Sequence, residues 1–284
     1  MEGIINWNEL WKTMRSGYYR RRAREEEEDP VSMWDKMAKQ FNESMMQNRE
    51  RAEKQIAKIE LAPEYTVLDI GAGTGRLAIP IAKQVKSVTA IDPSRGMLAC
   101  LQENMEKEEV ENITCVNKGW EDVELGVDIE PHDVVIASHS ITILFDIQEA
   151  LAKLDASAKK HSYIFTFAGR WMDGGEEELW KAIYGERQRQ RTQTWSDYIY
   201  LCNILHDMKI YANVEIMDSD YEQRYKSLDE AVTKWTEMRD IPAEKEDVLR
   251  SYLSKILAED NGTLCLKRES KSAMIWWQKD VAKV

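Results

Sequence analysis

The chain has 284 residues, 43% of them hydrophobic, so it is long enough to bury a substantial core as one domain with additions. Its 39 basic and 51 acidic residues give a net charge of −12, which disfavours a nucleic-acid-binding surface. The four cysteines form no CxxC pair, which argues against a disulfide framework and against a metal site. There is no apolar run of about 18 residues and no signal-peptide pattern after Met1, so we expect a soluble, cytoplasmic protein.

The first 31 residues combine an apolar stripe with two charged runs. The stripe has the spacing of one helix face and consists of Trp7, Leu10, Trp11 and Met14. A basic run over 20–24 and an acidic run over 25–29 follow it. Two interpretations stay open. This segment is either a solvated helix or linker with self-compensating charge, or an arm that packs on another subunit or folds over the active site.

A second helix is predicted to begin at Ser32. With Asp35 three residues later, Ser32 has the pattern of a helix N-cap followed by an acidic first turn. An apolar stripe continues along this helix, which we expect to run through Arg51 to Ile59. Pro63 ends it, because the residue before a proline disfavours helical backbone.

Strands and helices then alternate along the chain. Predicted strands span 65–70, 87–92, 113–116, 133–137 and 163–168, and predicted helices span 74–84, the stretch that starts at Pro93-Ser94, and 146–154. This alternation predicts βαβ units and a parallel sheet. Beyond Gly169 the pattern changes to helices over 176–187, 196–208, 227–239 and 243–258, strands over 214–217 and 272–277, and a turn at Asn261-Gly262.

The stretch from Val67 to Arg76 has the pattern of a strand, a glycine-rich turn and a helix. Such a turn brings a ligand against bare backbone at the carboxyl end of a strand. The dinucleotide fingerprint has its third glycine where this chain has Arg76. Asp69, just before the turn, would repel a phosphate and suits an ammonium group. The pattern therefore favours a cofactor with a zwitterionic end.

With these residues the chain resembles the class I S-adenosylmethionine-dependent methyltransferases, whose first motif is an acid followed by a Gly-x-Gly-x-Gly turn. The resemblance implies an α/β fold with a Rossmann-like, doubly wound sheet of seven strands, the last one antiparallel. It also implies an N-terminal helical cap and helical insertions near the C-terminus. The corresponding division is an arm and capping helix over 1–60, a cofactor-binding core over 61–170, and a C-terminal part of the same domain over 171–284.

The resemblance implies a site for S-adenosylmethionine, with S-adenosylhomocysteine as product. Asp92, at a strand end, would accept the ribose hydroxyls, although a dinucleotide fold would use it in the same way. Gly119 stands where the family commonly has an Asp for the adenine, so the adenine would stack near Trp120 and take its hydrogen bond from backbone, with Glu121 as a substitute acceptor. The cofactor residues expected in full are Asp69, Gly71, Ala72, Gly73, Thr74, Gly75, Asp92, Pro93, Met97, Gly119, Trp120, Glu121, Ser138 and His139.

Several residues are candidates for contact with the methyl acceptor. His139 follows the fourth strand and is either a general base or a structural histidine bonded to backbone. Trp34 and Phe41 of the capping helix are substrate contacts or core residues. Arg170 would clamp an anionic group or pair with a nearby Glu, and Trp171 lies beside it.

The acceptor class follows less directly from the residues. The acidic net charge and the aromatic-bearing cap favour methyl transfer to an O, N or S nucleophile of a small molecule. The partners expected are then a small-molecule acceptor and a second copy in a homodimer, with no DNA and no membrane. A protein or RNA methyltransferase that uses the arginines of 20–24 is one alternative, and a SAM-binding regulatory protein without transfer activity is another. An NAD-dependent oxidoreductase has the wrong glycine spacing.

Overall fold

The computed structural model describes residues 5–24, 30–46, 49–169, 176–185, 197–239 and 241–279. The chain divides into two compact units. The first comprises residues 1–168, 197–217 and 272–284, and the second comprises 169–196 and 218–271. The second unit therefore takes in most of the segment in which helical insertions were expected.

The first unit contains a seven-stranded sheet with the strand order β3-β2-β1-β4-β5-β10-β6. Strands β1 to β5 pair in parallel, as their alternation with helices predicted, and β10 runs antiparallel to β5, as the resemblance implied. These strands are rich in β-branched residues, which favour extended backbone. Their bounds are Thr66–Ile70 (β1), Ser87–Ile91 (β2), Ile113–Val116 (β3), His132–Ser138 (β4), Ala158–Phe167 (β5), Asn213–Asp218 (β6) and Lys271–Gln278 (β10).

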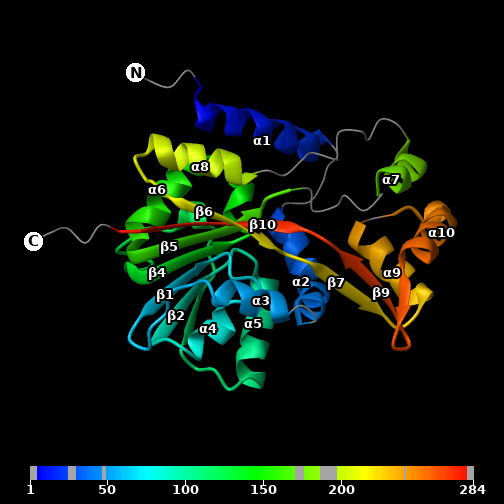
Figure 1. The fold of residues 1–284 in the computed structure, drawn as a ribbon, viewed down its shortest axis with the longest axis horizontal. Coiled ribbons are helices and arrows are strands. Elements are labelled where there is room, and N and C mark those ends of the chain that lie inside the picture. The colour runs from blue at the N-terminus through cyan, green and yellow to red at the C-terminus, as the bar shows by residue number, and fades with distance from the viewer. Residues whose placement is uncertain are drawn as a thin grey trace, which may run out of the picture. The chain divides into compact units, whose positions relative to one another are not determined.

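Helices cover both faces of this sheet (Figure 1). One face packs against α1 (Trp7–Arg24), α6 (Ile147–Ser157) and α8 (Asp197–Asp207). The other packs against α3 (Arg49–Ile56), α4 (Ala78–Ala82) and α5 (Arg95–Lys107). Because β1 to β5 are buried from both sides, their side chains form the core between the two helical layers.

The helix α1 packs against the core of the first unit. Trp11 has an exposed fraction of 0%, and its Nε1 donates to the carbonyl oxygen of Leu144 at 3.0 Å. The face that carries Trp11 is therefore buried, and the prediction of a solvated helix or linker was wrong for it. The side chains of residues 17–30 are outside the described part of the structure, which leaves the role of the two charged runs as a prediction.

The described residues of the predicted helix over 32–59 are helical in α2 (Pro30–Met46) and in α3, which ends at Ile56, and residues 47–48 lie outside the described part. Ser32 lies inside α2 and does not cap it, so this prediction was wrong. Pro30 is the first helical residue of α2, a position where its missing N–H is not needed. The Asp35 carboxylate accepts hydrogen bonds from α5, and this contact positions the site described below.

The helix after the glycine turn is shorter than the predicted 74–84. Residues 71–75 form a turn with positive φ at three glycines, and α4 begins only at Ala78. Positive φ is incompatible with right-handed helix, so the glycines that make the turn also delay the helix. The turn therefore places non-helical backbone next to the carboxyl end of β1.

The second unit has its own core and its own sheet. Its helices are α7 (Glu176–Tyr184), α9 (Leu228–Arg239) and α10 (Glu246–Ile256), and Trp235 lies fully buried among them. The strands β7 (Tyr221–Tyr225), β9 (Thr263–Arg268) and β8 (Ala258–Asp260) form an antiparallel sheet that the sequence did not predict. The turn predicted at Asn261-Gly262 is confirmed, since it connects β8 to β9 and both residues have positive φ.

In the part of the chain that the structure describes, each helix is too short or too polar to span a lipid bilayer.

Candidate functional site

Three glycines shape the turn after β1. Gly71, Gly73 and Gly75 have φ angles of 71°, 56° and 88°, a region that other residues enter only at a cost. A Cβ on Gly71 would lie 2.2 Å from Ser140 Cβ, so this glycine lets the loop after β4 pack on the turn. A Cβ on Gly73 would have only Phe41 Cε1 near it, at 3.9 Å. Among the described residues, the Phe41 side chain is therefore what lies over Gly73 on this side.

Two further turn residues were predicted for the site and lie in it. The N–H groups of Gly71 and Ala72 both donate to the carbonyl of Ile91, at 2.8 and 2.9 Å, which ties the turn to the end of β2. The carbonyl of Thr74 accepts from Asn104 Nδ2 at 3.0 Å. These bonds anchor the turn to the end of β2 on one side and to Asn104 of α5 on the other.

Asp92 follows β2 and lies against the glycine turn. Its Oδ2 accepts from the Gly73 N–H at 2.9 Å, and its Oδ1 accepts from the Ser94 N–H at 2.9 Å. Burial raises the pKa of the carboxyl, and the two backbone hydrogen bonds oppose that rise. Each oxygen has a second lone pair, so both keep the capacity to accept another donor. Asn117 bonds the carbonyls of Asp92 and Pro93 and fixes the strand end.

The helix α2 is attached to the start of α5. Asp35 Oδ1 accepts from Ser94 Oγ at 2.6 Å and from the Gly96 N–H at 2.8 Å, and these bonds lower the pKa of Asp35. A Cβ on Gly96 would lie 2.7 Å from the carbonyl oxygen of Asp35, so the two helices touch through backbone here. Farther along, Asn42 and Asn104 exchange amide hydrogen bonds.

An aromatic pair of α2 lies beside the glycine turn. Trp34 and Phe41 meet edge to face with centroids 5.5 Å apart, and they pack with Ala38 against Met97 and Cys100 of α5. Phe41 reaches Gly73, so it covers the turn. Met97 is almost fully buried in this cluster. A substrate contact of Trp34 or Phe41, and an adenine contact of Met97, remain predictions.

Asp69, at the end of β1, is a buried carboxyl. Burial raises its pKa to about 7; the nearby Asp92 adds to the rise and Arg76 opposes it. Burial and the charge of Arg51 lower the pKa of Arg76 to about 10. The Nη2 of Arg76 donates to Ser138 Oγ at 3.0 Å. An acid, a guanidinium group and a hydroxyl therefore meet where β1 and β4 end.

The loop after β4 holds His139 in an uncommon conformation. Its φ is 56°, its N–H donates to the Phe165 carbonyl at 2.8 Å, and its ring lies 4.4 Å from that of Phe167. Arg51 Nη2 lies 2.9 Å from its Nε2. Burial, Arg51 and Arg76 lower the pKa of His139 well below its usual value. To act as a base through Nε2, His139 would have to lose the bond to Arg51, and its lowered pKa makes it a weak base.

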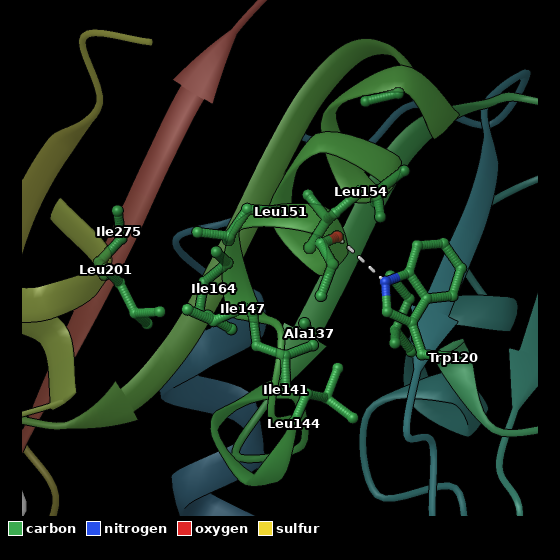
Figure 2. Packing of buried hydrophobic residues seen from close by; sticks show 14 of the residues in the cluster. Trp120, Ala137, Ile141, Leu144, Ile147, Leu151, Leu154, Ile164, Leu201 and Ile275 are labelled. Carbon is green, nitrogen blue, oxygen red and sulfur yellow. Dashed lines mark hydrogen bonds between the residues drawn. The ribbon is translucent and has the colours of Figure 1, made fainter. Parts of the chain in front are cut away.

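The indole of Trp120 belongs to the core and does not face the site. Its exposed fraction is 4%, its Nε1 donates to the Ala150 carbonyl at 3.1 Å, and it packs near Leu154 (Figure 2). A ring buried in this way has no free face, so the predicted stacking of adenine on Trp120 was wrong. Lys153 bonds the carbonyls of Trp120 and Glu121. Contacts of the cofactor with the backbone of Gly119 to Glu121 remain predictions.

Two of the predicted acceptor-side residues cannot be placed. Arg170 and Trp171 lie outside the described residues. Sequence reasoning in turn missed Asp35 as a link to α5, and it missed Arg51 and Arg76 as members of the site. A charged residue directly after the third glycine was the available signal for Arg76. For Arg51 the sequence carries no such signal, because its partner His139 is 88 residues away.

The arrangement fits a nucleoside that carries an amino acid. Asp92 can still accept two hydroxyl donors, Phe41 is what lies over the Gly73 backbone among the described residues, and the acid Asp69 suits an ammonium group. Phosphates would have to lie next to both Asp69 and Asp92. The donor and acceptor set therefore suits S-adenosylmethionine better than a dinucleotide.

Comparison with known proteins agrees with this geometry. Residues 67–161 match a family described as "methyltransferase domain". A protein of Haemophilus influenzae described as uncharacterized is 30% identical over 261 residues, which cover 88% of this chain and 90% of that protein. The crystal structure of the YcgJ protein from Bacillus subtilis has the same fold, with a TM-score of 0.51 at 15% identity, over 80% of this chain and 97% of that chain.

Two shorter matches are to proteins with different substrates. A probable cobalt-precorrin-6B C(15)-methyltransferase of Methanococcus vannielii is 37% identical over 57 residues, 20% of this chain and 32% of that protein. A probable ribosomal RNA small subunit methyltransferase A of Methanosarcina acetivorans is 29% identical over 115 residues, 40% of each. Since the chain spans less than half of either protein, these matches do not determine the methyl acceptor.

Proposed function

Because the chain belongs to the class I S-adenosylmethionine-dependent methyltransferases, we propose that it transfers a methyl group to an O, N or S nucleophile of a small molecule by direct displacement. The observation that carries this proposal is the contact of Asp92 with the glycine turn beneath Phe41. The glycine turn, the Asp92 carboxylate and the Phe41 ring that covers the turn lie together at the carboxyl ends of β1 and β2, where open α/β sheets bind ligands.

Each part of the site has a role in holding the cofactor. Asp92 would accept the ribose hydroxyls, Asp69 would face the ammonium group, and Phe41 would cover the turn. When bound, S-adenosylmethionine supplies a methyl group made electrophilic by its sulfonium. The protein then has to bring the nucleophile in line at about 3–3.5 Å, so positioning supplies most of the catalysis.

The small-molecule acceptor is supported by the charge and by the cap. A net charge of −12 opposes the binding of RNA, whose phosphates need basic surfaces. The cap helix α2, bonded to α5 through Asp35, restricts the space above the glycine turn. An acceptor of modest size fits such a covered site better than a folded macromolecule does.

An RNA acceptor is the second candidate, and the match to a ribosomal RNA methyltransferase favours it. Incubation of the protein with methyl-labelled S-adenosylmethionine and a cell extract separates the two candidates. We expect label in the low-molecular-weight fraction. Label in RNA or in protein would contradict the small-molecule proposal.

Cofactor binding is tested separately by thermal unfolding. S-adenosylhomocysteine at 100 times its dissociation constant should stabilise the protein by about 2.7 kcal/mol, whereas NAD should not. An Asp92→Ala variant should lose most of this stabilisation. Tight binding of the cofactor without label transfer to any fraction would favour the regulatory, non-catalytic alternative.

A further inference from the structure

Three nitrogen-bearing side chains meet at the carboxyl ends of β1 and β4. Arg51 Nη2 lies 2.9 Å from His139 Nε2, and Arg76 Nη2 lies 3.0 Å from Ser138 Oγ. They come from α3, from the loop after β4 and from the end of the glycine turn, so the fold brings together residues far apart in the sequence. Under the proposed function the methyl acceptor would lie near this cluster, because open α/β sheets bind ligands at the carboxyl ends of their strands.

The protons of this cluster can be assigned from its contacts. A guanidinium group has donors and no acceptor, so His139 Nε2 must accept from Arg51. The neutral imidazole then carries its proton on Nδ1. Both His139 Nδ1 and Arg76 Nη1 are buried without a hydrogen-bond partner among the described residues. Two buried donors thus lack an acceptor, a state that is unfavourable until a ligand supplies one.

The electrostatic potential at this place is positive. Arg51 and Arg76 both lower the pKa of His139, and Arg51 also lowers the pKa of Arg76. Asp69 is the carboxylate that acts on Arg76, and its own pKa of about 7 means that it is only partly ionised at neutral pH. The field at the imidazole therefore favours a ligand with negative charge.

We propose that Arg51, Arg76 and His139 form a receptor for an oxyanion, so that the methyl acceptor is a small molecule with a carboxylate or phosphate group. This inference rests on the proposed function and adds the class of the substrate. An oxyanion would accept from the buried donors, and a guanidinium group binds carboxylate and phosphate by paired hydrogen bonds.

The cofactor is a second source of a carboxylate, but it does not balance the charge. Its amino acid end carries an ammonium group as well, so that end is neutral overall. Its sulfonium adds one positive charge to those of the two guanidinium groups. An acidic acceptor would offset this charge, and its acid group would anchor it at the ends of β1 and β4.

The test uses the full chain saturated with S-adenosylhomocysteine and titrated with inorganic phosphate or with acetate, with calorimetry as the readout. We expect binding in the wild type that weakens at least tenfold in Arg51→Gln and is partly recovered in Arg51→Lys. The control is Arg49→Gln on the same helix, because Arg49 is exposed and pairs with Glu108. This control should bind both anions like the wild type.

Three outcomes would overturn the proposal. The first is that the wild type binds S-adenosylhomocysteine but neither anion. The second is that Arg49→Gln loses as much anion affinity as Arg51→Gln does. The third concerns the cofactor's carboxylate: Arg51→Gln would weaken S-adenosylhomocysteine tenfold and leave 5′-methylthioadenosine, which lacks the amino acid, unchanged. Failure of S-adenosylhomocysteine itself to bind the wild type would instead refute the proposed function.

Discussion

Asp35 of α2 accepts from Ser94 Oγ at 2.6 Å and from the Gly96 N–H at 2.8 Å, and so fastens the capping helix to the start of α5. Ser94 also donates its N–H to Asp92, the residue expected to hold the ribose. One chain of hydrogen bonds therefore connects the cap to the cofactor site. Through this chain of bonds the position of Phe41 above Gly73 depends on Asp35, which lies earlier on the same helix α2.

The first prediction concerns this connection. Asp35→Ala removes both acceptor contacts, so α2 should separate from α5 and expose the glycine turn. We expect the affinity for S-adenosylhomocysteine to fall about tenfold, which is about 1.4 kcal/mol. Titration calorimetry measures it, with Lys39→Ala as the control, since Lys39 is exposed on the same helix. Equal affinity in the two variants would show that the cap does not depend on Asp35.

The second prediction compares two glycines with positive φ. Gly126 has a φ of 80° and open space around it, so Gly126→Ala should cost only the backbone strain, about 1–2 kcal/mol. Gly71→Ala adds a Cβ 2.2 Å from Ser140 Cβ, so overpacking adds to the backbone strain and the total cost should be about 2–5 kcal/mol. Denaturant unfolding gives both values. Equal losses would mean that the loop after β4 moves aside freely.

The sequence was informative where the determinants are local. The glycines of the turn and Asp92 at the next strand end are read from a short pattern, and the structure brings them together. The pairs Asp35–Ser94 and Arg51–His139 are 59 and 88 residues apart, and no periodicity connects them. They arise from how the helices pack on the sheet, which only the folded chain determines.

Trp120 illustrates a different failure of sequence reasoning. It stands in the loop that follows β3, where an aromatic ring suggests stacking on adenine, yet its indole enters the core beside α6. A loop residue can point to the ligand or to the core, and its neighbours in the sequence do not distinguish these directions. The strands β7 and β9 were not predicted because each carries a short apolar signal: β7 has only tyrosine and glutamine apart from its charged residues, and β9 ends in Lys267 and Arg268.

The third prediction concerns pH. Burial raises the pKa of Asp69 to about 7 in the free protein. Its contribution to stability is therefore complete below the unfolded-state pKa and is lost as the pH rises through about 7. A bound ammonium group favours the ionised form, so binding of S-adenosylhomocysteine should release a proton below pH 7.

As the pH rises toward 7, the affinity for S-adenosylhomocysteine should then increase up to tenfold for each pH unit. Above pH 7 the affinity should level off. Calorimetry in buffers of different ionisation enthalpy measures the released protons between pH 6 and 8. Asp69→Asn cannot ionise and should remove the pH dependence. An affinity that stays constant across this range in the wild type would mean that Asp69 does not face the ammonium group.

The fourth prediction tests the role of Trp120. Trp120→Phe loses the bond from Nε1 to the Ala150 carbonyl and leaves a small cavity in the core. We expect a loss of stability of about 1–3 kcal/mol, measured by denaturant unfolding. The affinity of the folded protein for S-adenosylhomocysteine should change less than twofold. A much larger loss of affinity would indicate that the ring contacts the cofactor after all.

The fifth prediction concerns the attachment of α1. Arg15 Nη2 lies 3.1 Å from Asp197 Oδ2, and the two side chains are only 4% and 3% exposed. Burial raises the pKa of Asp197, and the charge and hydrogen bond of Arg15 oppose this rise. Arg15→Met leaves a buried carboxylate without this partner, so we expect a loss of about 3–5 kcal/mol at neutral pH.

The matched control for Arg15→Met is Lys12→Met, because Lys12 lies on the same helix α1 and forms a more exposed ion pair, with Asp146. It should cost about 0–1 kcal/mol. Loss of Arg15 should also raise the pKa of Asp197 further, so Arg15→Met should recover part of its stability at pH 5, where that carboxyl is protonated more readily. A double variant with Asp197→Leu should recover most of it, since no charge then stays buried. If Arg15→Met unfolds like Lys12→Met, then α1 is held by the packing of Trp11 and not by this ion pair.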